Sequence, residues 1–221
     1  MYTSRMKQTL CSILLLGALA VVLFIHNVVV AEARSGPRLK SRVALIVDQS
    51  SGEIIYEKNA SEAAPIASVT KLMTAMVIID SGVPLLESIT IAKADVDRYK
   101  GSRSKLGVGT TLLRAEVLKL ALMASENRAS AALARVFPGG KVGFVIAMNS
   151  KAKSLGMNDT NFVDSTGLRP GNVSTGHDLV KLAQAALSYP LIRQYTTTSS
   201  FQLRAKMGKR PVRLDLSLIH I

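Results

Sequence analysis

Apolar helical periodicity fills the middle of this 221-residue chain, and segments with strand character lie on both sides of it. In the first helical stretch, Leu72, Ala75, Met76 and Ile79 recur at three- and four-residue spacing, so one face of that helix belongs to a core. Further central helices are predicted over residues 112–124, 128–136 and 141–155. A chain of this length supports one core. This order, with helices in the middle and strands on both sides, predicts an α/β (α+β) fold in which an antiparallel sheet lies beside a helical lobe.

The segments with strand character predict how the sheet is built. Residues 44–47 and 53–57 flank the turn sequence Gln49-Ser50-Ser51-Gly52, which is typical of a β-hairpin. Residues 202–214 predict one further strand with an exposed edge. Because strands lie near both ends, we expect them to pair into one antiparallel sheet, with a cleft between it and the helices. Elsewhere we expect a short strand at residues 88–92, an exposed loop beside the cleft at 95–110, and a helix at 177–188.

A serine and a lysine lie one helical turn apart at the start of the first helix, in the stretch Ser68-Val69-Thr70-Lys71. Side chains three apart share a helix face, so the Lys71 amine can reach the Ser68 hydroxyl. Serine is a poor nucleophile near neutral pH and needs a neighbouring base. Lysine can be that base only if burial or a cationic neighbour lowers its pKa. Ser-x-x-Lys occurs often by chance, and taken alone the pair would be read by default as an ordinary surface pair.

A second motif, Ser125-Glu126-Asn127, follows a later apolar helix. The two motifs, in this order and with flanks such as residues 43–48 and 161–168, resemble the serine DD-peptidases, which are the low-molecular-mass penicillin-binding proteins. The resemblance covers roughly residues 40–200. Within this family the sequence of the motifs and their flanks is most similar to the D-alanyl-D-alanine endopeptidase branch. The resemblance implies a DD-peptidase/β-lactamase-like fold.

The resemblance also implies a role for each motif residue. Ser68 would attack the substrate carbonyl and form an acyl-enzyme, from a position at a helix N-terminus, and Lys71 would be the base. Ser125 would relay a proton to the leaving amine, and Asn127 would hold Lys71 and the substrate amide by hydrogen bonds. As alternatives, Ser125 could merely cap the following helix and Asn127 could be a surface residue. Glu126 is expected to point outward.

The third motif of the family, Lys-Thr-Gly, does not occur after Asn127; the nearest stretch, Lys206-Met207-Gly208-Lys209, lacks the hydroxyl residue. In the family this motif lies on a strand that lines the cleft and supplies the second oxyanion donor. The last residues resemble a translated sequencing adapter. We therefore expect a partial DD-peptidase domain at residues 42–214 that lacks its C-terminal sheet strands, a non-native tail at 215–221, and no activity in the fragment.

The N-terminus predicts export. Arg5 and Lys7 precede an apolar run over residues 10–25, and Ala31-Glu32-Ala33 offers small residues for cleavage. This layout predicts a signal peptide at residues 1–33 and a flexible lead-in at 34–41, with an uncleaved anchor as the alternative. The single cysteine, Cys11, lies in the leader, which suits a periplasmic protein without disulfides.

Charge and composition narrow the partners. The chain carries 28 Lys and Arg against 15 Asp and Glu, a net charge of +13. The basic residues are scattered and aromatic residues do not interleave with them, which, with export, argues against nucleic acid. Two explanations of the positive charge remain. The chain could be attracted to an anionic envelope surface or cell-wall polymer, including peripheral or anchored membrane association, or it could simply have a basic, solvated surface. No cofactor or metal is expected, because His26 and His220 fall in the leader and tail and His177 sits beside a helix cap.

Three functions are compatible with these residues. The first is a D-Ala-D-Ala carboxypeptidase or DD-endopeptidase that acts on peptidoglycan peptides and is inhibited by β-lactams. The second is a non-catalytic muropeptide- or penicillin-binding module. A β-lactamase of the same fold is the third and weakest, because no glutamate follows Glu126 to activate a deacylating water.

Overall fold

The computed structural model describes residues 39–207 and 210–217, and the side chains up to Gln202. The predicted leader at 1–33, most of the lead-in and the last four residues of the predicted tail lie outside this part. Its strands are β1 (Ala44–Val47), β2 (Ile54–Lys58), β3 (Ala64–Pro65), β4 (Ser88–Thr90), β5 (Thr110–Leu113), β6 (Val173–Ser174), β7 (Ser200–Met207) and β8 (Arg210–Ser217). Its helices are α2 (Thr70–Asp80), α3 (Arg114–Met123), α4 (Asn127–Arg135), α5 (Gly140–Ser154), α6 (Gly176–Leu187) and α7 (Pro190–Thr196), with short 3-10 turns η1 (Ala67–Val69) and η2 (Lys93–Asp95).

The predicted N-terminal hairpin is confirmed. β1 and β2 pair antiparallel, with Ala44 opposite Lys58 and Ile46 opposite Tyr56. The Asp48 carboxylate closes the turn by accepting hydrogen bonds from the backbone N–H groups of Ser50 and Ser51, at 2.9 and 2.7 Å. Aspartate is favoured in such turns because its side chain binds backbone amides two or three residues later.

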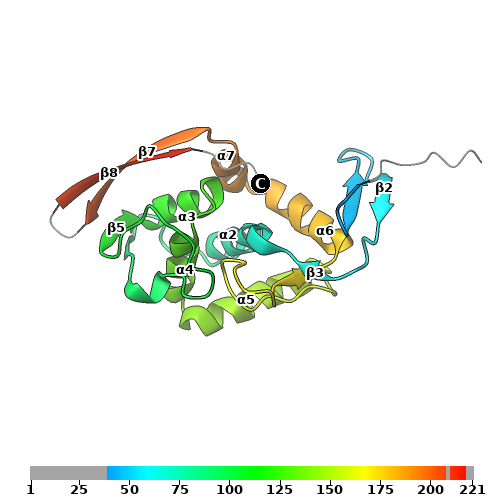
Figure 1. The fold of residues 1–221 in the computed structure, drawn as a ribbon, viewed down its shortest axis with the longest axis horizontal. Coiled ribbons are helices and arrows are strands. Elements are labelled where there is room, and N and C mark those ends of the chain that lie inside the picture. The colour runs from blue at the N-terminus through cyan, green and yellow to red at the C-terminus, as the bar shows by residue number, and fades with distance from the viewer. Residues whose placement is uncertain (1–38, 208–209, 218–221) are drawn as a thin grey trace, which may run out of the picture. The chain divides into compact units, whose positions relative to one another are not determined.

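The expectation that the strands pair into one sheet is wrong for the described strands. β1 and β2 form a sheet of their own, β3 pairs with β6, and a four-stranded sheet has the order β4-β5-β7-β8. Figure 1 shows the β1–β2 hairpin beside α6 and the β7–β8 hairpin on the side of α3 and β5. The reason lies in the connections, since β5 leads directly into α3 and β7 follows α7, which packs against α3.

Residues 202–214 were expected to form one strand, and the structure divides them between two. β7 pairs with β5 through Thr110–Met207 and Thr111–Lys206, and it then pairs along its whole length with β8, from Ser200–Ser217 to Met207–Arg210. Among the described strands, β8 is therefore one edge of this sheet and β4 is the other. Because β8 runs on to Ser217, the domain boundary predicted after residue 214 falls inside a strand and stays a prediction.

The predicted helices are confirmed, with small shifts at their ends. The largest concerns residues 112–124, where the helix begins only at Arg114 because Thr110–Leu113 pairs with β4. The Glu116 carboxylate accepts the backbone N–H of Leu113 at 2.8 Å and so fixes this helix start. Gly156, expected just beyond the end of α5, has φ +69°.

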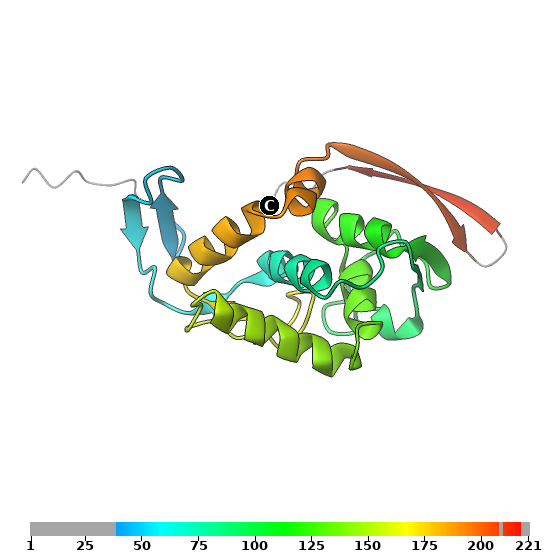
Figure 2. The same cartoon turned by 180° about the vertical axis from the view of Figure 1, so that it is seen from behind.

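α2 is the central helix of the lobe and packs against α3, α4, α5, α6 and α7. Figure 2 shows it surrounded by these helices. One apolar face was predicted, but burial extends around the helix: Met73 and Met76 share one face, Ile78 lies on another side, and all three are almost completely buried. The same helix buries three polar residues, Thr70, Lys71 and Thr74. Buried polar groups require partners, and these partners form the site described below.

α4 and α5 meet at a sharp turn. Gly139 and Gly140 both have positive φ there, and a Cβ at Gly143 would lie 2.6 Å from the Pro138 carbonyl oxygen. Within the described residues, no single helix is long and apolar enough to cross a membrane; α4 and α5 reach that composition only together, across a 99° bend.

Candidate active site

Ser68 lies in the 3-10 turn η1, which leads directly into α2 at Thr70. The residue before it, Ala67, has φ +44°, a conformation that costs free energy for any residue with a side chain. The backbone of Gly167 packs directly against this point, since a Cβ at Gly167 would lie 1.8 Å from the Ala67 carbonyl oxygen. The segment that contains Gly167 therefore fixes the strained turn that presents Ser68.

The Lys71 ammonium donates three hydrogen bonds: to Ser68 Oγ at 3.1 Å, to Asn127 Oδ1 at 2.9 Å and to the Thr166 carbonyl oxygen at 2.9 Å. A lysine has three donors, so all are used. The side chain comes from a residue that is only 2% exposed. The structure thus brings three of the four predicted site residues into one hydrogen-bonded group.

Burial lowers the pKa of Lys71 to about 8, although the negative charges of Asp164 and Glu126 act in the opposite direction. With a pKa near 8, about one lysine in ten is neutral at pH 7, compared with fewer than one in a thousand for an exposed lysine. A neutral amine 3.1 Å from a serine hydroxyl can accept its proton. The pKa and the distance together give Lys71 the properties of a general base.

Asn127 is the first residue of α4 and joins the lysine to the loop after η2. Its Nδ2 donates to Ser102 Oγ at 3.0 Å. Within this loop the Asp97 carboxylate accepts the backbone N–H groups of Tyr99, Lys100 and Ser102. Burial raises the pKa of Asp97, but the bonds from Ser102, Lys100 and Tyr99 outweigh it and lower the pKa to about 2. The predicted loop at 95–110 is therefore attached to the site through Ser102.

Ser125 lies in the turn between α3 and α4 with φ +50° and is half-buried. Among the described residues its hydroxyl makes no hydrogen bond to Ser68 or Lys71, so its proposed relay role stays a prediction. The cap of α4 is Glu126, whose carboxylate accepts the Arg128 N–H at 3.0 Å. The expectation that Glu126 points outward is wrong, because this capping bond turns it back and leaves it 9% exposed.

The segment from Asp164 to Gly167 supplies a group that the sequence analysis missed. The Asp164 carboxylate accepts the backbone N–H groups of Thr166 and Gly167, both at 2.7 Å, and thereby sets the Thr166 carbonyl toward Lys71. Asn172 ties the segment to α2, because its Nδ2 donates to Thr70 Oγ1 at 2.9 Å. An aspartate two residues before a backbone N–H is the pattern of an Asx turn, and this signal could have indicated the segment.

Buried hydroxyl groups lie beneath the same segment. Thr74 Oγ1 donates to the Ser165 carbonyl oxygen at 2.8 Å, and Ser130 Oγ donates to it at 2.5 Å. Ser165 Oγ in turn donates to the Ser130 carbonyl oxygen at 3.0 Å. All three residues are at most 5% exposed. Two helices, α2 and α4, are thus cross-linked through the carbonyl that precedes Thr166, which makes this wall of the site rigid.

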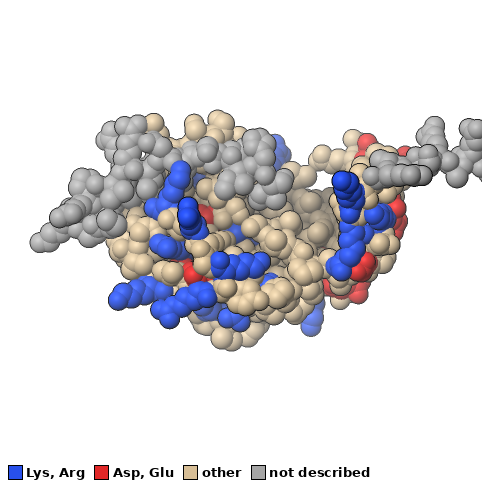
Figure 3. Space-filling model, viewed as in Figure 1, with Lys and Arg blue, Asp and Glu red and all other residues tan. Residues whose placement is uncertain are grey.

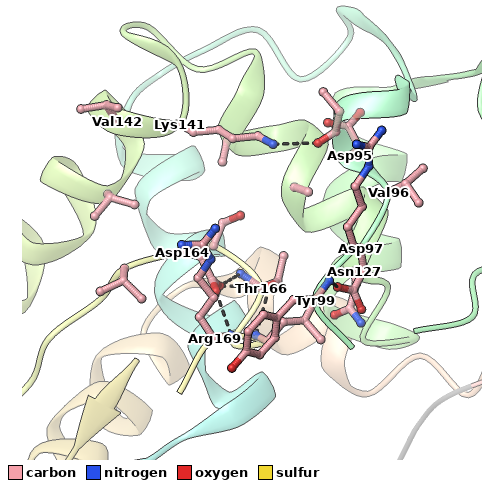
Figure 4. Close-up of a pocket in the computed structure, with 18 of the residues that line it drawn as sticks. Asp95, Val96, Asp97, Tyr99, Asn127, Lys141, Val142, Asp164, Thr166 and Arg169 are labelled. Atoms are coloured by element: carbon pink, nitrogen blue, oxygen red, sulfur yellow. Dashed lines mark hydrogen bonds between the residues drawn. The ribbon is translucent and has the colours of Figure 1, made fainter. Parts of the chain in front are cut away.

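A cavity of about 1020 Å³ adjoins the hydrogen-bonded group. Asn127 and Thr166, both partners of Lys71, line it, and Ser68 and Lys71 do not. Figure 4 shows Asn127, Thr166 and Arg169 grouped in one part of the view, with Lys141 and Val142 in another. The cavity therefore begins at the far side of the two residues that hold the lysine.

His177 is separate from this group. Its Nε2 lies 3.2 Å from Glu57 Oε1 on β2, and no described hydrogen bond joins its ring to Ser68 or Lys71. This agrees with the prediction of a surface role in the first turn of α6. In the part of the chain that the structure describes, no group of three or more His, Cys, Asp or Glu residues is arranged to hold a metal ion.

The sequence profile of one family, D-alanyl-D-alanine carboxypeptidase (peptidase S11), matches residues 30–219. This chain belongs to that family. The predicted resemblance to the serine DD-peptidases is thereby confirmed.

Relatives within the family include D-alanyl-D-alanine endopeptidases. The chain is 49% identical to the one from Pseudomonas aeruginosa over 160 residues, which is 72% of this chain and 52% of that protein. It is 47% identical to the one from Escherichia coli over 168 residues, 76% of this chain and 54% of that protein. The chain thus spans about half the length of these curated relatives.

Solved structures of the family share the fold. The DD-transpeptidase of Streptomyces K15 superposes with a TM-score of 0.75 at 25% identity, over 82% of this chain and 74% of that one. A D-alanyl-D-alanine carboxypeptidase from Mycobacterium tuberculosis gives 0.70 at 26% identity, over 82% and 67%. The predicted α+β fold of the DD-peptidase type is confirmed.

Proposed function

We propose that this chain supplies the nucleophile and the base of a serine-type D-Ala-D-Ala carboxypeptidase or DD-endopeptidase that cleaves peptidoglycan stem peptides or their cross-links. The observation that carries the proposal is the contact between Lys71 Nζ and Ser68 Oγ at 3.1 Å, made by a buried lysine with a lowered pKa. Membership in the D-alanyl-D-alanine carboxypeptidase family supports the choice of substrate.

In the first step, neutral Lys71 takes the proton of Ser68 as Oγ attacks the carbonyl carbon that precedes the terminal or cross-linking D-amino acid. The carbonyl π electrons move onto oxygen, and the Ser68 backbone N–H is one donor available to that oxyanion. When the tetrahedral intermediate collapses, the C–N bond breaks and the leaving amine takes up a proton. Ser125 lies at the start of the motif that carries Asn127 and is the proposed relay for that proton.

In the second step, water attacks the Ser68 ester, Lys71 accepts the proton of that water, and the acid product leaves as Oγ regains a proton. The same Ser68 would open a β-lactam ring to give a stable acyl-enzyme, so we propose β-lactams as inhibitors. We place the reaction in the periplasm on the basis of the predicted leader, with peripheral or anchored membrane association as a further proposal.

The printed chain contains no Lys-Thr-Gly after Asn127. The family resemblance assigns to that motif the second oxyanion donor, and removal of one such donor costs about 10²–10³ in rate. We therefore propose that the 221-residue chain by itself releases no measurable D-alanine. On that ground a non-catalytic binding module is the second candidate for this chain.

The test uses a hybrid, in which residues 1–214 are followed by the segment of the E. coli relative that lies downstream of its matched region. Fluorescent penicillin should label the hybrid covalently, and Ser68→Ala should abolish the label, whereas Ser61→Ala on the exposed connection before η1 should leave it unchanged. A label that persists in Ser68→Ala would refute the nucleophile assignment. Labelling of the 221-residue chain at the rate of the hybrid would refute the need for the third motif.

A further inference from the structure

The cavity beside the catalytic lysine exposes a row of large apolar side chains. Val142 and Ile146 of α5 are 72% and 61% exposed, and Val163 in the segment after α5 is 40% exposed; all three line the cavity. Residues 142 and 146 are one helical turn apart and therefore lie on the same face of α5. Apolar side chains left in water at one concave site are typical of a binding surface.

The cavity also carries positive charge that no described residue neutralises. Lys93, Arg98 and Arg169 line it, and within the described residues their side chains make no hydrogen bond or ion pair. Figure 3 shows Lys and Arg side chains gathered on the face over η2 and the loop that follows it. These cations are available to a ligand.

The carboxylates that line the cavity, by contrast, are already occupied. Asp95 pairs with Arg135 at 2.8 Å, and Asp97 accepts backbone N–H groups of its own loop. Asp164 accepts backbone N–H groups of its own segment. These bonds hold the carboxylates in place without removing their charge, but the lining carries four Lys and Arg side chains, Lys93, Arg98, Lys141 and Arg169, against three Asp. The cations without partners among the described residues can therefore meet the charge of a ligand. A ligand that complements the cavity has carboxylates and small apolar groups.

We infer that this cavity binds a carboxylate-bearing part of the peptide substrate while the scissile bond lies at Ser68. The inference rests on the proposed function and adds a second contact region to it. The connection is made by Asn127 and Thr166, which bond Lys71 on one side and line the cavity on the other. Stem peptides suit such a site chemically, because a γ-linked glutamate leaves its α-carboxylate free next to an alanine methyl group.

The experiment titrates the 221-residue chain with two peptides and follows the methyl signals of Ile146 and Val163 by NMR. One peptide is L-Ala-γ-D-Glu-L-Lys-D-Ala-D-Ala, and the other carries a carboxamide in place of the free glutamate carboxylate. The acidic peptide should bind more tightly and shift both methyl signals. Arg98→Gln and Arg169→Gln should each weaken its binding roughly two- to fivefold, the range for exposed charge pairs, and leave binding of the amidated peptide unchanged.

Two further variants separate charge from shape. Arg193→Gln, at an exposed arginine on α7 outside the cavity, should leave both affinities unchanged. Ile146→Ser should weaken the binding of both peptides by the same factor, because it alters only the apolar wall of the cavity. Equal binding of the two peptides, or equal weakening by Arg193→Gln and Arg98→Gln, would overturn the inference.

Failure of the inference and failure of the proposed function give different results. If penicillin labels Ser68 in the hybrid but the chain does not distinguish the two peptides, the cavity assignment is wrong and the function stands. If the peptides are distinguished as expected but Ser68 is never labelled, the cavity is an acidic-peptide site in a chain without the proposed activity.

Discussion

The helical lobe and the β1–β2 hairpin differ in how completely their side chains are packed. In the lobe, Met73 and Met76 of α2 are fully buried, and the buried Lys71 has a partner for each of its donors. In the hairpin, Ile54 and Ile55 remain 47% and 63% exposed. A two-stranded sheet alone is marginal in water. The difference teaches that the lobe by itself builds the hydrogen-bonded pair of Ser68 and Lys71, and that the hairpin contributes little to holding it.

The lobe should be the part on which chemistry depends most. Lys71→Met in the hybrid keeps an apolar chain of similar length but removes the amine that we propose as the base. We expect the rate of penicillin labelling to fall about 10²–10⁴-fold, the usual contribution of general base catalysis. Circular dichroism should show an unchanged helical content. Lys58→Met on β2 is the matched control, and a similar loss in that variant would show that the effect is not specific to the site.

Packing should separate the two regions next. Met76→Ala removes a fully buried side chain and should lower the free energy of unfolding by about 2–5 kcal/mol. Ile55→Ala in the hairpin should cost about 0.5 kcal/mol or less, because this side chain is already mostly in water. Urea denaturation of both variants measures the difference. Equal losses would show that the hairpin is as well packed as the lobe and would contradict the comparison.

Two glycines with positive φ test the turn that presents Ser68. Gly167→Ala should destabilise the protein by about 2–4 kcal/mol and slow labelling, because its Cβ would meet the Ala67 carbonyl oxygen at 1.8 Å. Gly101→Ala has a similar φ but no atom within 4 Å of the new Cβ, so about 1–2 kcal/mol of backbone strain is expected. If Gly101→Ala were the more harmful change, contact with Ala67 would not be what fixes Ser68.

The charge around Lys71 should produce the smallest effect. Glu126→Gln keeps an oxygen to cap α4 but removes a negative charge that raises the pKa of Lys71. The pKa of Lys71 should then fall further below 8. The pH midpoint of labelling in the hybrid should shift to lower pH by a fraction of a unit. Glu62→Gln, on the exposed connection between β2 and β3, should not move the midpoint; an upward shift in Glu126→Gln would be the opposite of the expected sign.

The local features were predictable from the sequence, and the long-range ones were not. The periodicity of residues 72–79 indicates a helix, and the turn residues at 49–52 indicate a hairpin. Both patterns involve only residues close together in the chain, so both elements were predicted correctly. Which strands pair depends on connections across the whole fold, and the pairing of β5 with β7 was therefore missed. The sequence pattern of one strand does not identify the strand with which it pairs.

The candidate site divides in the same way. Ser68 and Lys71 are one helical turn apart, and their contact follows from spacing alone. The Thr166 carbonyl and Ser102 reach the site from 95 and 25 residues away along the chain from Lys71 and Asn127, respectively, and no local pattern links them to it. Glu126 was misplaced because a polar residue after a helix is usually exposed, whereas here it caps α4.

The central claim is that Ser68 is activated by a lysine that burial has made partly neutral, and the pH dependence of acylation tests it most directly. The rate constant for penicillin labelling of the hybrid should be measured from pH 5.5 to 10. We expect it to rise about tenfold per pH unit, with a midpoint near 8, and then to level off as Lys71 loses its proton. A rate that is independent of pH across this range, or a midpoint near the ordinary lysine value of about 10.4, would contradict the account.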